Sequence, residues 1–363
     1  MKMKINALFT GLIMAFLLIS CGNSDDDVAF GLNTGSLGLG KEVDPCLGLG
    51  ESDLVLSIQD QYTSLPGKIS ILFKVSETDG TPVAGLKAEQ FTIYEQGRND
   101  ACFNTISASE SFARISPNAQ KFNNHTLLVL DLSNSVLSGS LTELKTASNS
   151  FIDQVFPDNP SSAFKMGIYW FDGEAELHQL HDFSADPEAL KAAIDDIKTD
   201  ISNDPSTNLY GAVIEATDKA EAIIAQNKKE EVIGAASIVV FTDGTDQAAR
   251  FSESEVTNKV KNANANISYF TIGLGSEIDT QILAEIGKTA SVIAQDKAEL
   301  EATFNAISVK VANQANSFYL FEYCTPKRDG SGENNLAIKL QHNNLQGAVQ
   351  TKFNASGFTG GCE

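Results

Sequence analysis

Three hard oxygen donors follow a short apolar run near the middle of this chain. The run, TLLVL at residues 126–130, is followed directly by Asp131, and Ser133 and Ser135 come next at alternate positions. A branched apolar run without alternation is typical of a strand buried on both faces of a parallel sheet. Such sheets bind their ligands at the carboxyl ends of the strands. Asp131, Ser133 and Ser135 are therefore predicted to hold a divalent cation at such an edge.

Two more oxygen donors fall where an α/β fold would bring them to the same edge. Thr207 ends the polar loop 202–207, and Asp243 directly follows a second apolar run, residues 237–242. Carboxylates and hydroxyls suit Mg²⁺, Mn²⁺ or Ca²⁺, whereas zinc and copper sites draw on thiolate or imidazole. Because only two of the five donors are charged, the ion keeps Lewis acidity, and a carboxylate of a partner can replace one of its waters.

The order of these five residues resembles the metal-ion-dependent adhesion site of the von Willebrand factor type A family, which reads D-x-S-x-S, then a distant Thr, then a distant Asp. The resemblance covers residues 124–315 and includes TNLYGA at 207–212 and FTDG at 241–244. It implies a domain that binds protein ligands through its metal, often by an acidic side chain of the partner, and that usually performs no chemistry. The alternative is a chance D-x-S-x-S at a strand end, where Asp and Ser commonly begin turns and caps.

The elements that must position these residues alternate between strand and helix across the centre of the chain. Apolar residues recur at helical spacing in some segments, and others are apolar runs of strand length. Helices are predicted at 141–155, 210–224, 279–286 and 298–311, and strands at 126–130, 166–171, 237–242 and 266–275. This alternation predicts an α/β fold with a doubly wound, mostly parallel, Rossmann-like sheet for residues 119–316.

Short strand patterns flank this central region on both sides. They are separated by turn sequences such as LPG at 65–67. The predicted strands are 54–58, 69–75 and 91–94 before the central region, and 318–323, 336–340 and 348–353 after it. We expect residues 49–118 and residues 317–363 to build one small β-sandwich together, with the α/β domain inserted between them.

The first residues have the pattern of a bacterial export signal. Lys2 and Lys4 precede an apolar stretch, residues 5–19, that is short for a transmembrane helix but suits the core of a signal peptide. The stretch ends in LISC, which resembles a lipobox. Residues 1–20 are therefore predicted to be a lipoprotein signal peptide, and Cys21 is predicted to carry the lipid.

The residues that follow the predicted lipidation site are rich in Gly, Asp, Ser and Asn. Residues 21–48 are predicted to form a flexible tether, and the polar segment 22–27 disfavours the alternative that Cys21 lies in a core helix. The glycine after Cys21 is similar to the pattern of lipoproteins sent to an outer membrane. We expect a protein of the bacterial cell envelope, anchored by its lipid at the outer membrane, on the periplasmic face or on the cell surface.

Four cysteines remain after Cys21, and in an exported chain an even number indicates two disulfides. Three pairings are open. We favour Cys46 with Cys102 and Cys324 with Cys362, because each pair then encloses one flank of the central domain. A metal role is the alternative, but the spacings contain no C-x-x-C.

The charge balance limits the class of partner. The formal net charge of the 363-residue chain is -21, and removal of residues 1–20 takes away two lysines and no acidic residue. Such a chain repels nucleic acid and anionic lipid head groups, and it favours cations or basic partners. We therefore expect no nucleic-acid binding and no membrane attachment besides the lipid.

Catalytic motifs are weaker than the metal motif. His178 and His181 form an H-x-x-H, but an edge strand is predicted there, and residues three apart on a strand point to opposite faces. Neither Ser133 nor Ser135 lies in a G-x-S-x-G elbow. We therefore expect a protein that is not an enzyme.

The favoured function is adhesion or another protein–protein interaction through a divalent cation, Mg²⁺ or else Mn²⁺ or Ca²⁺. The first alternative is a non-catalytic accessory subunit of an envelope assembly or enzyme complex, in which the metal site is structural. The second is a hydrolase that activates water at the metal. It would need a general base near the ion, and the sequence singles none out.

Overall fold

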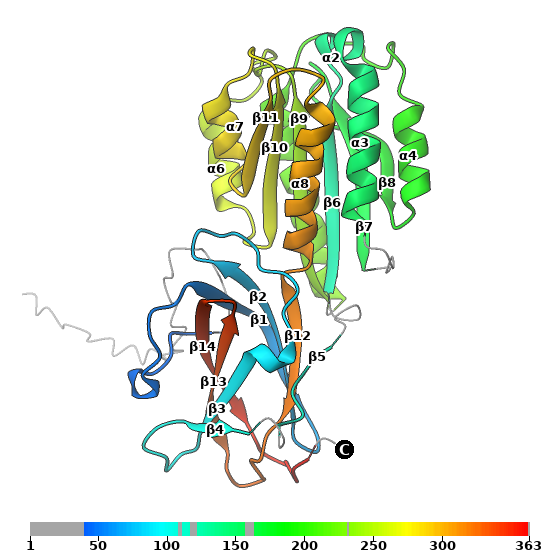
Figure 1. Ribbon diagram of the computed structural model, residues 1–363. Coiled ribbons are helices and arrows are strands. Elements are labelled where there is room, and N and C mark those ends of the chain that lie inside the picture. Colours follow the sequence, from blue (N-terminus) through cyan, green and yellow to red (C-terminus); the bar gives the residue numbers. More distant parts are fainter. Residues whose placement is uncertain (1–39, 108–110, 117–121, 157–162, 231, 362–363) are drawn as a thin grey trace, which may run out of the picture. The chain divides into compact units, whose positions relative to one another are not determined.

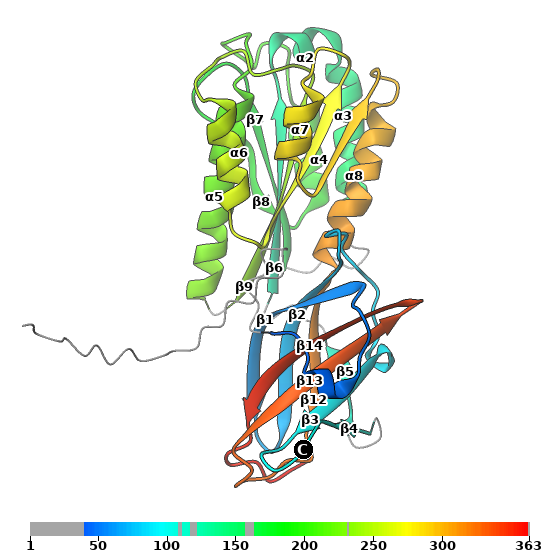
Figure 2. The same ribbon diagram turned by 90° about the vertical axis from the view of Figure 1, so that its left-hand side faces the viewer.

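The computed structural model describes residues 40–107, 111–116, 122–156, 163–230 and 232–361 (Figures 1 and 2). Within these residues the chain forms one six-stranded α/β sheet and two four-stranded antiparallel sheets. The strand order of the α/β sheet is β11-β10-β9-β6-β7-β8, and every pairing in it is parallel except that of the edge strand β8 with β7. This agrees with the predicted doubly wound, mostly parallel sheet.

The elements of the α/β region follow one another as strand and helix along the chain. Its strands are β6 (Phe122–Asp131), β7 (Phe164–Phe171), β8 (His178–Ser184), β9 (Ile233–Thr242), β10 (Ile267–Leu274) and β11 (Ala290–Ala294). Its helices are α2 (Asn134–Gly139), α3 (Leu141–Val155), α4 (Pro187–Asp195), α5 (Leu209–Lys229), α6 (Glu253–Asn262), α7 (Thr280–Ile286) and α8 (Leu300–Ala315).

Helices cover both faces of the α/β sheet, which explains why its central strands carry buried apolar side chains on both faces. On β6, Leu128 and Leu130 belong to the core shared with α3, α4 and α8. Leu127 and Val129 belong to the opposite core, shared with α5, α6 and α7. All four side chains have no solvent exposure, and each contributes about 1.5–3 kcal/mol by burial.

The remaining strands form the two antiparallel sheets. One sheet has the order β1-β2-β12-β5 and the other β14-β13-β3-β4. Their bounds are β1 (Leu54–Ser64), β2 (Lys68–Glu77), β3 (Phe91–Gln96), β4 (Asn104–Ile106), β5 (Arg114–Ser116), β12 (Phe318–Cys324), β13 (Glu333–His342) and β14 (Leu345–Asn354), with short 3₁₀ turns η1 (Pro45–Leu47) and η2 (Ala88–Gln90). Each sheet combines strands from before and after the α/β region, which confirms the prediction that both ends of the chain build the sandwich.

The two antiparallel sheets share one apolar core. Phe73 on β2 lies 5.5 Å from Phe91 on β3 between ring centroids, and Phe321 on β12 lies 5.0 Å from Phe91. Burial alternates along β3, as expected for a strand with one face in the core and the other outside. The contact between Phe91 and Phe321 joins strands that lie on opposite sides of the α/β region in the sequence.

A carboxyl group lies in this sandwich core. Glu95 on β3 is 1% exposed, and the hydroxyl of Tyr323 on β12 donates to its Oε1 at 3.0 Å. Desolvation by burial raises the pKa of Glu95 above its usual value, against the hydrogen bonds from Thr325 and Tyr323 and the charge of Lys327. The ionised side chain is therefore disfavoured in the folded protein.

Replacing Glu95 with Gln is expected to raise the free energy of unfolding above pH 7. Because the pKa of Glu95 is raised in the folded state, its contribution is intact below the unfolded value near 4.5 and is lost as pH rises through the folded pKa. Glu95→Ala should instead cost about 1–3 kcal/mol, since it leaves the buried Tyr323 hydroxyl without its acceptor. Urea unfolding from pH 4 to 8 measures both effects. The exposed Glu89→Gln is the control, and a Glu95→Gln variant less stable than wild type at pH 8 would contradict the assignment.

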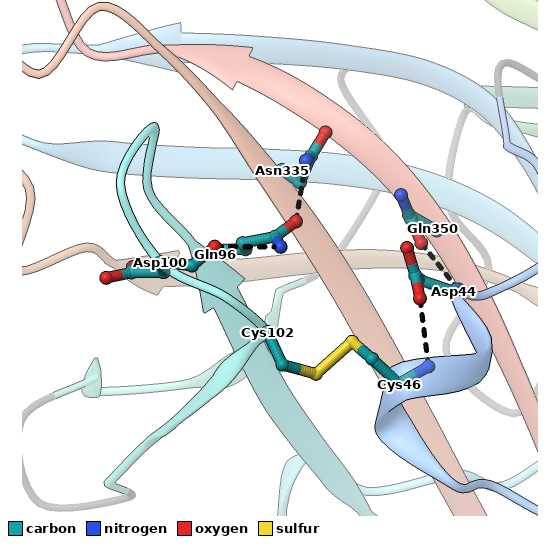
Figure 3. Close-up of a disulfide and its surroundings, with 7 residues drawn as sticks. All are labelled: Asp44, Cys46, Gln96, Asp100, Cys102, Asn335 and Gln350. Atoms are coloured by element: carbon teal, nitrogen blue, oxygen red, sulfur yellow. Dashed lines mark hydrogen bonds between the residues drawn. A yellow bond between two sulfur atoms is a disulfide. The ribbon is translucent and has the colours of Figure 1, made fainter.

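A disulfide between Cys46 and Cys102 joins η1 to the loop between β3 and β4 (Figure 3). The Cα atoms are 5.9 Å apart, and the cysteines are separated by 56 residues in sequence. This confirms the predicted Cys46–Cys102 pair. Cys324 is also disulfide-bonded. Cys362 lies outside the described residues, as does the predicted lipidation site Cys21, so the pairing of Cys324 with Cys362 and the lipid anchor stay predictions.

The last part of the expected tether belongs to the folded region. Lys41 pairs with Gln350 on β14, with backbone hydrogen bonds of 2.8 and 2.9 Å in the two directions. The side chain of Gln350 also accepts from the backbone of Asp44 at 2.8 Å, and Cys46 follows in η1 (Figure 3). Glycine-rich composition indicated flexibility here, but the disulfide and this backbone pairing fix residues 41–46 to the sandwich.

No helix in the described part of the chain has both the length and the apolar character needed to cross a membrane.

Candidate metal centre

Adjacent parallel strands bring the predicted donors to one edge of the α/β sheet. β6 and β9 pair in parallel, with Leu130 opposite Phe241, so both strands reach the same edge, at the end of the sheet where α2 begins (Figure 1). Asp131 is the last residue of β6, and Asp243 directly follows β9. Two carboxylates 112 positions apart in sequence thus come close because the strands are neighbours. We call Asp131, Ser133, Ser135, Thr207 and Asp243 the candidate metal centre.

A chain of hydrogen bonds joins four of these five residues. Asp131 accepts through Oδ1 from the backbone N–H of Ser133 at 2.9 Å. The hydroxyls of Ser133 and Ser135 lie 3.2 Å apart, and Ser135 Oγ donates to Asp243 Oδ1 at 2.8 Å. Ser133 is also the N-cap residue of α2. The turn from strand to helix therefore aligns both serine hydroxyls with the two carboxylates.

The carboxyl group of Asp131 is held in a dry environment. Its side chain has no solvent exposure, and Thr242 Oγ1 donates to its Oδ2 at 2.6 Å. Burial raises the pKa of Asp131 to about 6, and the nearby charge of Asp243 adds to the shift. Hydrogen bonds from Thr242 and Ser133 act in the opposite direction. A cation beside this carboxylate would compensate for the water it has lost.

The pKa of Asp243 is also raised. Burial is the main cause, and the charge of Glu277 raises the pKa further, whereas the hydrogen bond from Ser135 lowers it. Two carboxylates with raised pKa values thus lie within one hydrogen-bond chain. A negatively charged site lined by oxygen atoms binds a hard dication more readily than it binds a lysine or arginine side chain.

Thr207 approaches from the loop between α4 and α5. It is 2% exposed, and its carbonyl accepts from the backbone of Gln247 at 2.8 Å and of Ala248 at 3.0 Å. A Cβ atom placed on Gly244 would lie 4.0 Å from Thr207 Oγ1. Thr207 is therefore next to the loop that carries Asp243. Its hydroxyl makes no hydrogen bond to the other four residues in the described part of the chain. A shared ion is what would link it to them.

Two residues of this edge were not predicted from the sequence as part of the site. Thr242 binds Asp131 directly, and the only signal for it was its position before Asp243 in the FTDG segment. Asp246 accepts hydrogen bonds from the backbone N–H groups of Tyr210 and Ala249, each at 3.0 Å. It therefore clamps the loop after β9 to the first turn of α5.

The two histidines of the H-x-x-H motif do not form a pair. His181 lies on β8, and its Nδ1 is 2.7 Å from the carbonyl of Asp182. His178 begins β8, and its ring stacks on Trp170 with centroids 4.1 Å apart. Their separation agrees with the expectation that residues three apart on a strand do not converge on one ion.

Comparison with known families and structures identifies the α/β region. The family model described as von Willebrand factor type A domain matches residues 127–306. No curated protein matches the chain. Similar solved structures include the conserved hypothetical protein BatB from Bacteroides thetaiotaomicron, which is 19% identical with a TM-score of 0.42, over 54% of this chain and 100% of that chain.

Two further solved structures are also similar to this chain. The vWF domain of the type V pili tip protein Mfa5 from Porphyromonas gingivalis is 13% identical with a TM-score of 0.39, over 53% of this chain and 95% of that chain. Proximal thread matrix protein 1 from the mussel byssus, in a form with a zinc-occupied MIDAS motif, is 14% identical with a TM-score of 0.40, over 59% and 49% of the respective chains.

Proposed function

We propose that this chain, which contains a von Willebrand factor type A domain, binds a protein partner through a divalent cation held at the candidate metal centre. The observation that carries the proposal is the convergence of two carboxylates and two serine hydroxyls in one hydrogen-bond chain, with Thr207 beside it. All these donors are oxygens. We therefore propose Mg²⁺, or else Mn²⁺ or Ca²⁺, as the ion.

The exposure of the donors supports a site that is open on one side. Asp131 and Ser133 are buried, at 0% and 1% exposure, whereas Ser135 is exposed and Asp243 is half-buried. Asp131 would thus bind the ion from the protein side, and Ser135 would lie at the solvent rim. The coordination position that faces solvent is then free for a carboxylate of the partner in place of water.

Charge explains why the cation is needed for such a contact. The chain has a formal net charge of -21, and the pKa values of Asp131 and Asp243 are both raised. Without the ion, an incoming carboxylate would meet two like charges across a short distance. A dication cancels those two charges. We infer a partner that offers one acidic side chain surrounded by basic residues, which the acidic surface attracts.

The domain is proposed to work at the bacterial cell envelope. The lipobox-like LISC segment, which ends at Cys21, supports a lipid anchor at the outer membrane, on its periplasmic face or on the cell surface. We assign the domain a binding role and no catalytic step, because its donor set accounts for ion and ligand binding without a proton-transfer residue.

Calorimetric titration of Mg²⁺ into the purified full-length chain tests the ion site. Ser135→Ala removes one neutral ligand and is expected to weaken Mg²⁺ binding by about tenfold, the loss that corresponds to about 1.4 kcal/mol. Ser138→Ala is the matched control on the same helix, because its hydroxyl donates to the carbonyl of Asn134 at 2.6 Å and not to the site. Equal Mg²⁺ affinity in Ser135→Ala and Ser138→Ala would contradict the assignment of Ser135.

Binding to envelope proteins then tests the partner. We expect the immobilised chain to retain its partner in Mg²⁺, to release it in EDTA, and to retain less of it when Ser135 is replaced. A partner that stays bound equally in EDTA would show that the contact does not pass through the ion.

A further inference from the structure

A second group of metal-binding side chains lies in the hairpin between β7 and β8. Asp172 directly follows β7, Glu174 comes two residues later, and His178 begins β8. One ligand atom from each of these residues lies within 4.8 Å of the other two. We call these three residues the hairpin cluster. None of them belongs to the candidate metal centre.

The imidazole of His178 faces both carboxylates without a hydrogen bond to either. Its Nε2 is 3.2 Å from Glu174 Oε2 and 3.9 Å from Asp172 Oδ1. This nitrogen is shielded from solvent and has no partner with hydrogen-bond geometry among the described residues. The ring is held by stacking on Trp170, with an interplanar angle of 16°. A fixed, buried and unused nitrogen aimed at two carboxylates is typical of a metal ligand.

The two carboxylates of the cluster have an excess of negative charge. Asp172 has no solvent exposure, and Glu174 is 39% exposed. In the described part of the chain, neither forms an ion pair with a lysine or arginine. Asp172 is instead bound by neutral donors, at 2.8 Å by the backbone N–H of Glu174 and at 2.7 Å by the hydroxyl of Ser202. Apart from His178, no cationic side chain pairs with these two carboxylates in the described part of the chain, and this favours the binding of a cation.

We propose that Asp172, Glu174 and His178 bind one divalent first-row transition metal, with Zn²⁺ as the best fit. The donor set differs from that of the candidate metal centre, because it combines one imidazole nitrogen with carboxylate oxygens. Imidazole with carboxylate suits zinc, which usually takes three protein ligands and a water in such mixed sites. The hard ions Mg²⁺ and Ca²⁺, which prefer all-oxygen sites, should bind here more weakly.

The hairpin cluster also contacts the loop that carries Thr207. Ser202, which donates to Asp172 Oδ2, lies in that loop, and the backbone N–H of Asn208 donates to the carbonyl of Asp172 at 2.7 Å. A Cβ on Gly173 would collide with Ser206 and Asp204, so only glycine allows this close approach. A metal in the hairpin cluster would therefore add to the contacts that hold this loop, which also include the backbone hydrogen bonds of Thr207 with residues 247–248.

Nitrogen NMR of the histidine rings tests the proposal one residue at a time. The chain has four histidines, and His178→Gln identifies the ring signals of His178 by their loss. On addition of one equivalent of Zn²⁺ to the full-length chain, we expect the signals of His178 to move to a metal-bound position and those of His181 to stay. Ring signals of His178 that do not change up to millimolar Zn²⁺ would overturn the proposal.

Zinc affinity, measured by competition with a chromogenic chelator, gives the second test. His178→Gln and Glu174→Gln are expected to weaken Zn²⁺ binding at this site by at least tenfold. His181→Gln, on the same strand, should leave it unchanged. Ser135→Ala should also leave the His178 response unchanged, which separates this site from the candidate metal centre. Circular dichroism checks the fold of each variant. Wild-type zinc affinity in folded His178→Gln and Glu174→Gln, with all zinc binding dependent on Ser135, would overturn the proposal.

Discussion

Replacing Asp131 with Asn is expected to abolish Mg²⁺ binding while making the metal-free protein more stable at neutral pH. Asn keeps the shape of the side chain and can keep a hydrogen bond to Ser133 or to Thr242, but it removes the charge that burial disfavours. Mg²⁺ affinity should fall by at least a hundredfold, because the ion loses the charged ligand that binds it from the protein side.

The sign of the stability change follows from the pKa of Asp131. Burial raises this pKa from 3.8 to about 6 in the folded chain. The contribution of Asp131 to stability is therefore intact below pH 3.8 and is lost as pH rises through about 6. At pH 7.5 and in EDTA, the Asn variant should be more stable than wild type by up to about 3 kcal/mol, and at pH 4 the difference should nearly vanish.

Urea unfolding with and without Mg²⁺ measures both halves of this prediction. Mg²⁺ should stabilise the wild-type chain through mass action and leave the Asn variant unaffected. Asp200→Asn, an exposed carboxylate in the same domain, is the control and should change neither property. An Asn variant that binds Mg²⁺ like wild type would exclude Asp131 as a ligand. A variant that is less stable in EDTA at pH 7.5 would mean that hydrogen bonding outweighs the cost of the buried charge.

Removing the Cys46–Cys102 disulfide is expected to produce the largest loss of stability in the sandwich. The cross-link closes a segment of 56 residues, and the chain-entropy account of disulfides assigns about 4 kcal/mol to a loop of this length. The loop starts at η1 and includes β1, β2 and β3. The Cys46→Ala/Cys102→Ala double variant should therefore unfold at lower urea concentration, by an amount that corresponds to about 2–4 kcal/mol.

Two spectroscopic signals should separate the sandwich from the type A domain in this experiment. The only tryptophan, Trp170, lies on β7 of the α/β sheet, whereas four of the seven tyrosines lie on strands of the sandwich: Tyr62, Tyr94, Tyr319 and Tyr323. We expect the near-ultraviolet signal of the tyrosines to shift more than the fluorescence of Trp170, and Mg²⁺ affinity to stay at the wild-type value. The Ser138→Ala variant, which keeps both cysteines, is the control. Unchanged unfolding of the tyrosine signal in the double variant would show that the disulfide does not stabilise the sandwich.

Local patterns in the sequence were enough to predict most strands and helices and the class of the fold. The apolar runs that end before Asp131 and before Asp243 were typical of buried strands, because a strand with one exposed face carries polar residues at alternate positions. Some helices were missed although their start signals were present. The capping box of Ser252 and Glu255 opens α6, and Asp186 with Pro187 opens α4. The apolar stripes of both helices are short, so periodicity alone did not reveal them.

The sequence also determined the chemical type of the candidate metal centre, because the oxygen donors of Asp131, Ser135 and Asp243 limit the class of ion. Only the tertiary structure decided which donors touch one another, since Ser135 and Asp243 meet through the pairing of β6 with β9. The hairpin cluster could not be predicted in the same way. In the sequence, the H-x-x-H motif pairs His178 with His181. In the structure, the turn after β7 instead brings His178 next to Asp172 and Glu174. Residue types determine which ions the chain could bind. Long-range strand pairing and burial determine which of these residues come together in one site.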